Sequence, residues 1–194
     1  GITTSDTECL TDAGGGVWLC SNNQVISASG SPNKTGYTFT GWKNQSGADI
    51  AAGALFTVSS SSFILYAQWT ATNYTVTYAS AGGSTAPTGL TKNYGDIFTV
   101  GTSVNRNGYT FAGWNDDTTT YGAGSSYQMP ASNVSLTAQW TANIYSISYD
   151  WNGGTGSATA NSSYTVGTSG LTLPLVGNHV KDGYSFVGWS ETRN

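Results

Sequence analysis

Charged side chains are scarce in this sequence, and the few basic ones are not clustered. Lys, Arg, Asp and Glu together make up 8% of the 194 residues, against about 25% in soluble globular proteins. The net charge of −4 comes from 10 acidic and 6 basic side chains, whereas binding to a nucleic-acid backbone requires grouped Lys and Arg. We therefore expect no nucleic-acid partner. A polar surface built from Ser, Thr, Asn and Gly instead favours a secreted or cell-surface protein.

Histidine and long apolar runs are also lacking. Catalysis by a Ser-His-Asp triad needs a histidine, and the single one, His179, stands in a Gly-Asn-His-Val loop with no Gly-x-Ser-x-Gly motif elsewhere. His179 is therefore interpreted as an ordinary loop residue, and we predict no enzyme activity, no cofactor and no metal site. No apolar stretch approaches the roughly 20 residues that span a bilayer. Gly1 is interpreted as a processed or engineered start, so any anchor is expected outside this sequence.

Cysteine is limited to two residues, Cys9 and Cys20, which lie 11 positions apart. Two cysteines without nearby histidines are too few for a zinc site. In an extracellular protein they would pair and close a short loop, which stabilises by up to about 3 kcal/mol. The spacing permits pairing without requiring it, so we predict a disulfide and keep two free thiols as the alternative.

The clearest feature that is present is internal repetition. The pattern Gly-Tyr-x-Phe-x-Gly-Trp occurs at residues 36–42, 108–114 and 183–189. A Leu-x-Ala-Gln-Trp pattern occurs at 65–69 and 136–140, and a Tyr-x-Val/Ile-x-Tyr pattern at 74–78 and 145–149. Because all blocks share a period of 71 to 75 residues, the sequence predicts a tandem array.

Each repeated block has the two-residue periodicity of a half-buried strand. In residues 134–140, apolar side chains alternate with Ser, Thr and Gln, and strong helix formers are few throughout the chain. We predict a mainly β chain of small tandem modules, each a short mixed sheet with at most one short helix. The predicted modules are residues 1–69 (module one), 70–140 (module two) and 141–194 (module three). Links of only four residues, 70–73 and 141–144, predict a semi-rigid rod.

These blocks resemble the Listeria–Bacteroides repeat, also called the internalin B-repeat, which occurs in tandem in bacterial surface and secreted proteins. The resemblance rests on the three repeated patterns and on the turn Met129-Pro130-Ala131. It covers nearly the whole chain and is specific for modules two and three, whereas module one departs at Cys9 and Leu10. The resemblance implies a small β-grasp-like module on the bacterial exterior, and it implies no shared ligand.

Module three departs from the pattern at its end. Only five residues follow Trp189, whereas 26 positions separate Trp114 from Trp140 in module two. The closing strand would therefore be missing, which leaves backbone groups and apolar side chains uncovered. Two explanations stay open: the sequence was cut within a module, or a neighbouring chain donates the strand. The second explanation predicts self-association through module three.

Two groups of charged residues are candidates for surface sites. Lys34, Arg106 and Lys181 each lie two residues before a Gly-Tyr pair, and such a spaced row of cations could contact an anionic surface polymer. The alternative, which we favour, is a set of solvated cations at strand starts that aid solubility. The pair Asp116-Asp117 stands in a threonine-rich segment, where a turn is favoured over a weak cation site.

The recurring aromatics are interpreted as the core of each module, because they occupy equivalent positions in every repeat. Stacking on sugars would instead use aromatics outside the repeat pattern, such as Trp18 or Trp151. We predict a non-enzymatic, extracellular segment of a bacterial cell-surface protein that acts as a stalk, spacer or adhesin, with surface proteins or glycans as partners. The alternatives are a filament subunit assembled by strand donation and a carbohydrate-binding module.

Overall fold

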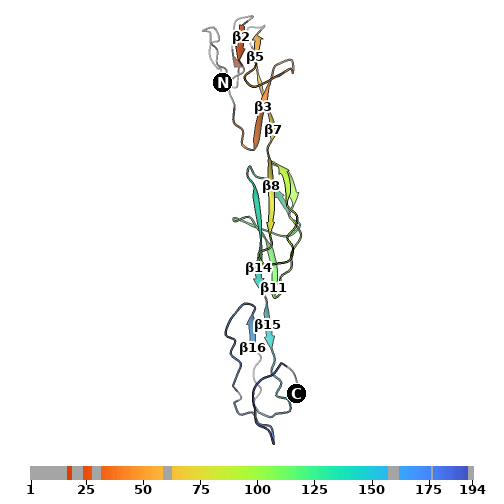
Figure 1. Ribbon diagram of the computed structural model, residues 1–194, viewed down its shortest axis with the longest axis vertical. Helices are drawn as coiled ribbons and strands as arrows, with labels where there is room; N and C mark the ends of the chain where they lie inside the picture. Colours follow the sequence, from red (N-terminus) through yellow and green to blue (C-terminus); the bar gives the residue numbers. More distant parts are fainter. Residues whose placement is uncertain are drawn as a thin grey trace.

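The computed structural model describes residues 17–18, 24–27, 32–58, 63–156, 162–175 and 177–191. Its sheets follow one another along a single long axis (Figure 1). No helix occurs within these ranges, and none of these residues therefore forms a helix that could cross a membrane. The prediction of mainly β tandem modules in a rod is confirmed. The predicted disulfide between Cys9 and Cys20 lies outside the described residues.

The strands fall into three groups along the chain. The first group is β1 (Val17–Trp18), β2 (Gln24–Ser27), β3 (Tyr37–Lys43), β4 (Asp49–Ile50), β5 (Leu55–Val58), β6 (Phe63–Ile64) and β7 (Tyr66–Ala71). The second group is β8 (Asn73–Ala79), β9 (Leu90–Asn93), β10 (Ile97–Thr99), β11 (Tyr109–Asn115), β12 (Thr120–Tyr121), β13 (Ser126–Gln128) and β14 (Val134–Ala142). The third group is β15 (Ile144–Ile147) and β16 (Ser162–Thr165).

Module two is built on a five-stranded sheet with the order β12-β11-β14-β8-β9. The closing strand β14 lies in the centre of this sheet, antiparallel to β11 and parallel to the first strand β8. A separate antiparallel pair, β10 and β13, completes the module. The first and last strands of the module are thus neighbours. In module one, β7 pairs with β3 in the same register that β14 adopts with β11.

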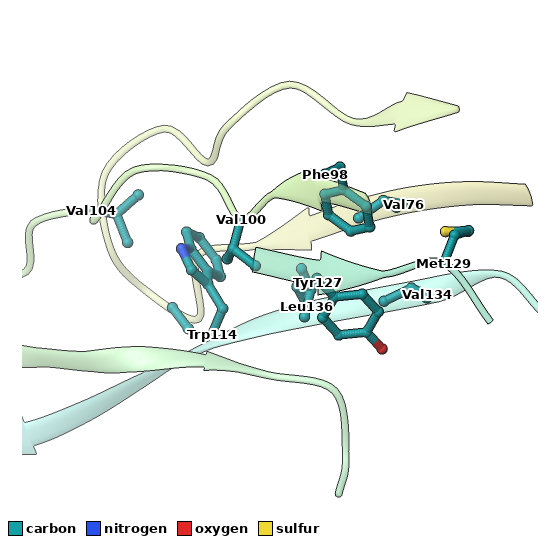
Figure 2. Packing of buried hydrophobic residues seen from close by; sticks show 10 residues of the cluster. Val76, Phe98, Val100, Val104, Trp114, Tyr127, Met129, Val134 and Leu136 are labelled. Carbon is teal, nitrogen blue, oxygen red and sulfur yellow. The ribbon is translucent and has the colours of Figure 1, made fainter. Parts of the chain in front are cut away.

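The core of module two lies between its sheet and the β10–β13 pair (Figure 2). Val134, Leu136 and Ala138 alternate along β14 and expose only 6%, 0% and 2% of their surface. This alternation confirms the predicted half-buried strand. Trp114 and Met129 fill the centre of this core and are almost completely buried. The core thus combines β-branched, aromatic and flexible side chains, which pack closely as in other protein interiors.

The aromatic residues of the repeated patterns pack on one another, as predicted. In module two the Phe111 ring lies 5.4 Å from Trp114 and 5.6 Å from Trp140, in edge-to-face geometry. In module one the equivalent ring of Phe39 lies 5.1 Å from Trp42 and 5.5 Å from Trp69. Each aromatic pair contributes about 0.5–1.5 kcal/mol beyond its buried area. The repeated aromatics therefore pack together in the same way in modules one and two.

The second glycine of the Gly-Tyr-x-Phe-x-Gly-Trp pattern forms a β-bulge. The register between β11 and β14 shifts between Phe111 and Gly113, and Gly113 has a φ of 137°. A Cβ at this position would lie 2.6 Å from the Thr120 methyl carbon and 2.8 Å from the Tyr121 carbonyl oxygen. Only glycine fits there, and the bulge directs Trp114 into the core.

Candidate functional site

The junctions between modules are the repeated sites of this chain. β7 ends at Ala71 and β8 begins at Asn73, while β14 ends at Ala142 and β15 begins at Ile144. The closing strand of one module thus runs into the first strand of the next (Figure 1). The structure narrows each predicted four-residue link to one residue, Thr72 or Asn143, outside the strands.

At the first junction, Thr72 is hydrogen-bonded to both neighbouring modules. Its N–H donates to the Gly36 carbonyl oxygen at 2.9 Å, and its own carbonyl oxygen accepts the Tyr94 N–H at 2.9 Å. Its hydroxyl oxygen lies 3.1 Å from that of Thr38. The chain therefore connects a turn of module one, the link and a turn of module two through main-chain hydrogen bonds.

The second junction repeats this arrangement at the equivalent positions. The Asn143 N–H donates to the Gly108 carbonyl oxygen at 2.9 Å, and the Asn143 carbonyl oxygen accepts the Val166 N–H at 3.0 Å. The Thr110 hydroxyl donates to the Asn143 side-chain oxygen at 2.6 Å. We call this set of contacts the junction relay. The junction relay is the same at Thr72 and at Asn143, because the link residue bonds to both modules through its main-chain N–H and carbonyl groups.

A glycine in each relay allows the next module to approach closely. Gly36 and Gly108 have φ values of 78° and 79°, a conformation that side chains rarely adopt. A Cβ on Gly36 would overlap the ring of Tyr94, and one on Gly108 would lie 2.8 Å from a Val166 methyl carbon. The first glycine of the repeated pattern is thus required by the turn and by the neighbouring module.

The three predicted surface cations stack on the tyrosine of their own turn. The Lys34 ammonium lies 4.1 Å from the centre of the Tyr37 ring. The matching distances are 3.9 Å for Arg106 on Tyr109 and 4.6 Å for Lys181 on Tyr184. Cation–π contacts at exposed sites contribute about 0.5–1 kcal/mol each. The cations thus support the turn, and their contact with an anionic surface polymer stays the less favoured hypothesis.

Two of these cations also fix the first hairpin turn of their module. Arg106 donates from Nη1 to the Ala81 carbonyl oxygen at 3.3 Å, and Lys181 donates from Nζ to the Asn152 carbonyl oxygen at 2.8 Å. Ala81 and Asn152 have positive φ values of 49° and 48°, as in tight turns. Each cation thereby links the Gly-Tyr turn of its module with a positive-φ turn in the same module.

The carboxylate of Asp116 organises the turn between β11 and β12. One of its oxygens accepts hydrogen bonds from the Thr118 hydroxyl at 2.7 Å and the Thr119 N–H at 2.8 Å, and the other accepts the Tyr127 hydroxyl at 2.9 Å. Burial alone would raise the pKa of Asp116, but these hydrogen bonds hold that pKa well below its ordinary value. Burial and the bond to Asp116 raise the pKa of Tyr127. Asn44 forms the equivalent turn in module one.

The other predicted site residues are packed into local structure. No cluster of three His, Cys, Asp or Glu side chains able to hold a metal occurs in the part of the chain that the structure describes. The ring of His179 stacks on that of Trp151, with centroids 3.2 Å apart. Trp151 also packs against Trp189 at 4.6 Å, so its ring belongs to an aromatic cluster of module three. The side chain of Trp18 lies outside the described residues.

An open groove of about 560 Å³ lies beside the first junction. Its lining residues are Thr35, Tyr37, Tyr94, Gly95, Gln128, Met129, Pro130 and Ala131. The Tyr37 and Tyr94 rings lie edge to face within it at 5.5 Å. Its lining carries no charged side chain, so the charge pattern of the sequence does not predict this groove.

Comparison with known proteins shows which sequences share these repeats. Three segments, residues 19–68, 74–139 and 145–194, match the family model described as the Listeria-Bacteroides repeat domain. No solved structure matches the chain.

Three relatives illustrate the wider similarity. An inferred membrane protein of Evansella cellulosilytica is 29% identical over 167 residues, which cover 84% of this chain and 24% of the relative. An inferred Gly-rich membrane protein of the same organism is 30% identical over 163 residues, covering 84% of the chain and 18% of the relative. Internalin H of Listeria monocytogenes is 34% identical over 124 residues, covering 62% of the chain and 22% of the relative. The chain thus spans less than a quarter of the length of these relatives.

Proposed function

This chain belongs to the Listeria-Bacteroides repeat family, and from this premise we propose that it is a non-enzymatic spacer in a bacterial cell-envelope protein. In this role the modules form a stalk that sets the distance between the parts of a longer protein. The names of the relatives support a cell-envelope location, since two are membrane proteins by name and one is an internalin. An extracellular position is part of the same proposal.

The observation that carries the proposal is the junction relay, found at both described junctions. Bending at Thr72 or Asn143 must break main-chain hydrogen bonds to the modules on either side. Each such bond contributes about 0.5–1.5 kcal/mol net. At the first junction, bending would also separate the Tyr37 and Tyr94 rings. Because only one residue separates consecutive strands, the chain has little slack with which to avoid these losses.

The spacer role is tested by measuring how rigidly neighbouring modules are held. Spin labels on unnatural residues at Gln45 and Ala123, both exposed, would report the distance between modules one and two without altering the native cysteines. A stiff junction predicts a single narrow distance distribution by pulsed electron resonance. A broad distribution in the unmodified chain would refute the spacer proposal.

A further inference from the structure

The turn that carries the second junction relay contains a chemically labile pair, Asn107-Gly108. We propose that this pair is a self-modification site, at which Asn107 loses its side-chain amide and becomes aspartate or isoaspartate without an enzyme. The co-reactant is water. This inference goes beyond the spacer role, because it assigns a covalent change to one of the two described junctions and a structural consequence to that change.

The reaction is an attack of the Gly108 main-chain nitrogen on the side-chain amide carbon, Cγ, of Asn107. The N–Cγ bond forms, the Cγ–Nδ2 bond breaks, and ammonia leaves with the proton that the Gly108 N–H gives up. Water then opens the cyclic imide. Opening at Cγ gives aspartate, whereas opening at the main-chain carbonyl carbon gives isoaspartate, whose main chain runs through Cβ. Glycine favours the attack because it has no Cβ to shield its nitrogen.

Asn107 and Gly108 are the two central residues of a four-residue turn. The Tyr109 N–H donates to the Arg106 carbonyl oxygen at 3.0 Å. Gly108 has a φ of 79°, while the φ of Asn107 is negative, as in a type II turn. The Asn107 side chain is exposed, so water reaches both carbonyl carbons of the imide.

The peptide group that must rotate for this attack has no hydrogen-bond partner among the described residues. This holds for the Asn107 carbonyl oxygen and for the Gly108 N–H, and also for the Asn107 side-chain amide. The side chain therefore approaches the Gly108 nitrogen without the loss of a hydrogen bond within the protein. The turn itself is closed by the Arg106 and Tyr109 main chains, which take no part in the reaction.

The other Asn-Gly pair of the chain, Asn152-Gly153, has the opposite arrangement. The Asn152 N–H donates to Asp150 Oδ1 at 2.8 Å, and the Asn152 carbonyl oxygen accepts a hydrogen bond from Lys181 Nζ at 2.8 Å. Rotation of this peptide group must break the bond from a charged donor, which is stronger than a neutral one. The structure thus distinguishes Asn107 from a pair of identical sequence.

The position of Asn107 in the turn is occupied by Thr35 in module one and by Asp182 in module three. Threonine has no amide to lose, so the first junction is exempt from this reaction. The turn in module three accommodates aspartate, since the Tyr184 N–H donates to the Lys181 carbonyl oxygen at 3.0 Å and Gly183 has a φ of 78°. The aspartate product is therefore compatible with the turn.

Isoaspartate is not compatible in the same way, because it lengthens the main chain by one carbon directly before Gly108. The Gly108 carbonyl oxygen accepts the Asn143 N–H at 2.9 Å. A Cβ on Gly108 would lie 2.8 Å from a Val166 methyl carbon, so the neighbouring module leaves no space for a displaced turn. Ageing of the protein should therefore loosen the second junction and leave the first unchanged.

The chemical step is tested by ageing the intact chain at mildly alkaline pH, where the attacking nitrogen ionises more readily, and mapping its peptides by mass spectrometry. We expect conversion at Asn107 to be at least about fivefold faster than at Asn152, the factor that corresponds to one hydrogen bond. In concentrated urea the two rates should be similar, because the turn and the Lys181 bond are lost. Labelling with isoaspartyl methyltransferase identifies the isoaspartate product.

The structural consequence is measured with spin labels on unnatural residues at Ala123 and Ser163, both exposed. Ageing should broaden this distance distribution across the second junction, whereas the distribution between Gln45 and Ala123 across the first junction should stay narrow. Asn107→Thr copies the residue of module one and is the matched control. In this variant both distributions should stay narrow during ageing.

Three results would overturn the inference. The first is conversion at Asn107 no faster than at Asn152 in the folded chain. The second is the same ratio of rates in urea as in the folded chain, since the turn would then have no influence. The third is an aged second junction that stays narrow, or that broadens equally in Asn107→Thr. A broad first junction before ageing would count against the spacer role instead, so the two failures are distinguishable.

Discussion

The ring of Tyr94 in module two stands edge-on to the ring of Tyr37 in module one, with centroids 5.5 Å apart. Gly36, which precedes Tyr37, makes room for this contact, because a Cβ there would overlap the Tyr94 ring. Glycine at this position is therefore tied to a neighbouring module as well as to its own turn.

The three equivalent glycines should separate these two effects. Gly36, Gly108 and Gly183 share φ values of 78° to 79°, so each Gly→Ala change costs about 1–2 kcal/mol of backbone strain. Only Gly36→Ala and Gly108→Ala also force apart neighbouring modules, because nothing lies within 4 Å of a Cβ on Gly183. We expect only those two variants to broaden the distance distribution across their junction. An equal broadening by Gly183→Ala, measured across either junction, would contradict this reasoning.

Leu136 should be among the most sensitive core positions of module two. Its side chain is fully buried in the centre of the sheet (Figure 2), so Leu136→Ala should destabilise the module by about 2–5 kcal/mol through lost burial and a cavity. Ser135→Ala changes an exposed neighbour on the same strand and should stay within about 0.5 kcal/mol. Urea unfolding followed by tryptophan fluorescence measures both, and similar midpoints for the two variants would rule out the assigned role of Leu136.

The Asp116 turn should make module two sensitive to acid. The pKa of Asp116 is lowered in the folded chain, so its contribution to stability is present above the unfolded value of about 3.9 and is lost as the pH falls further. Asp116→Asn should keep the turn, as Asn44 does in module one, while flattening the pH dependence of the unfolding free energy in that window. Asp117→Asn is the control for the change in charge, and an equal flattening by this variant would refute the assignment.

The partner of Asp116 has the opposite dependence. The pKa of Tyr127 is raised in the folded chain, so its contribution to stability is full below the unfolded value of about 10 and is lost as the pH rises above it. Tyr127→Phe removes the hydroxyl that donates to Asp116 and should abolish that alkaline loss of stability. Thermal unfolding at increasing pH checks this, with the unmodified chain as the reference.

Arg106 should stabilise its turn rather than serve mainly as a free surface charge. Arg106→Gln removes the contact with the Tyr109 ring and the bond to Ala81, and it should cost about 0.5–1 kcal/mol. Lys92→Gln removes a basic residue from β9 with the same change in net charge and should have a smaller effect. Unfolding in urea compares the two, and an equal loss would show that the stacking contact contributes nothing measurable.

The strand pattern of module two could be predicted from the sequence because its causes are local. Alternation in residues 134–140 predicted the buried face of β14. The turn at Asp116 was also predicted, but Tyr127, eleven residues away, could not be identified as its partner, because no local pattern joins them.

The junction relay could not be predicted for a different reason. Its link residues are Thr72 and Asn143, so no repeated side chain marks them, and the contacts to Gly36 and Gly108 are made by main-chain atoms. The short links predicted stiffness, but no pattern in the sequence indicates that each link is hydrogen-bonded on both sides. Among the repeated patterns, the sign of this contact is the first glycine of the Gly-Tyr pair, which at Gly36 and Gly108 is required both by its own turn and by the neighbouring module.

The main-chain character of the relay bears on how such arrays can change length. A junction between modules that is held by main-chain amide and carbonyl groups places few requirements on the side chains that meet there, apart from one glycine. A duplicated or deleted unit would therefore meet a new neighbour through the same bonds, without compensating substitutions. Unequal recombination between repeats could then lengthen or shorten the stalk one unit at a time while each new joint keeps its geometry.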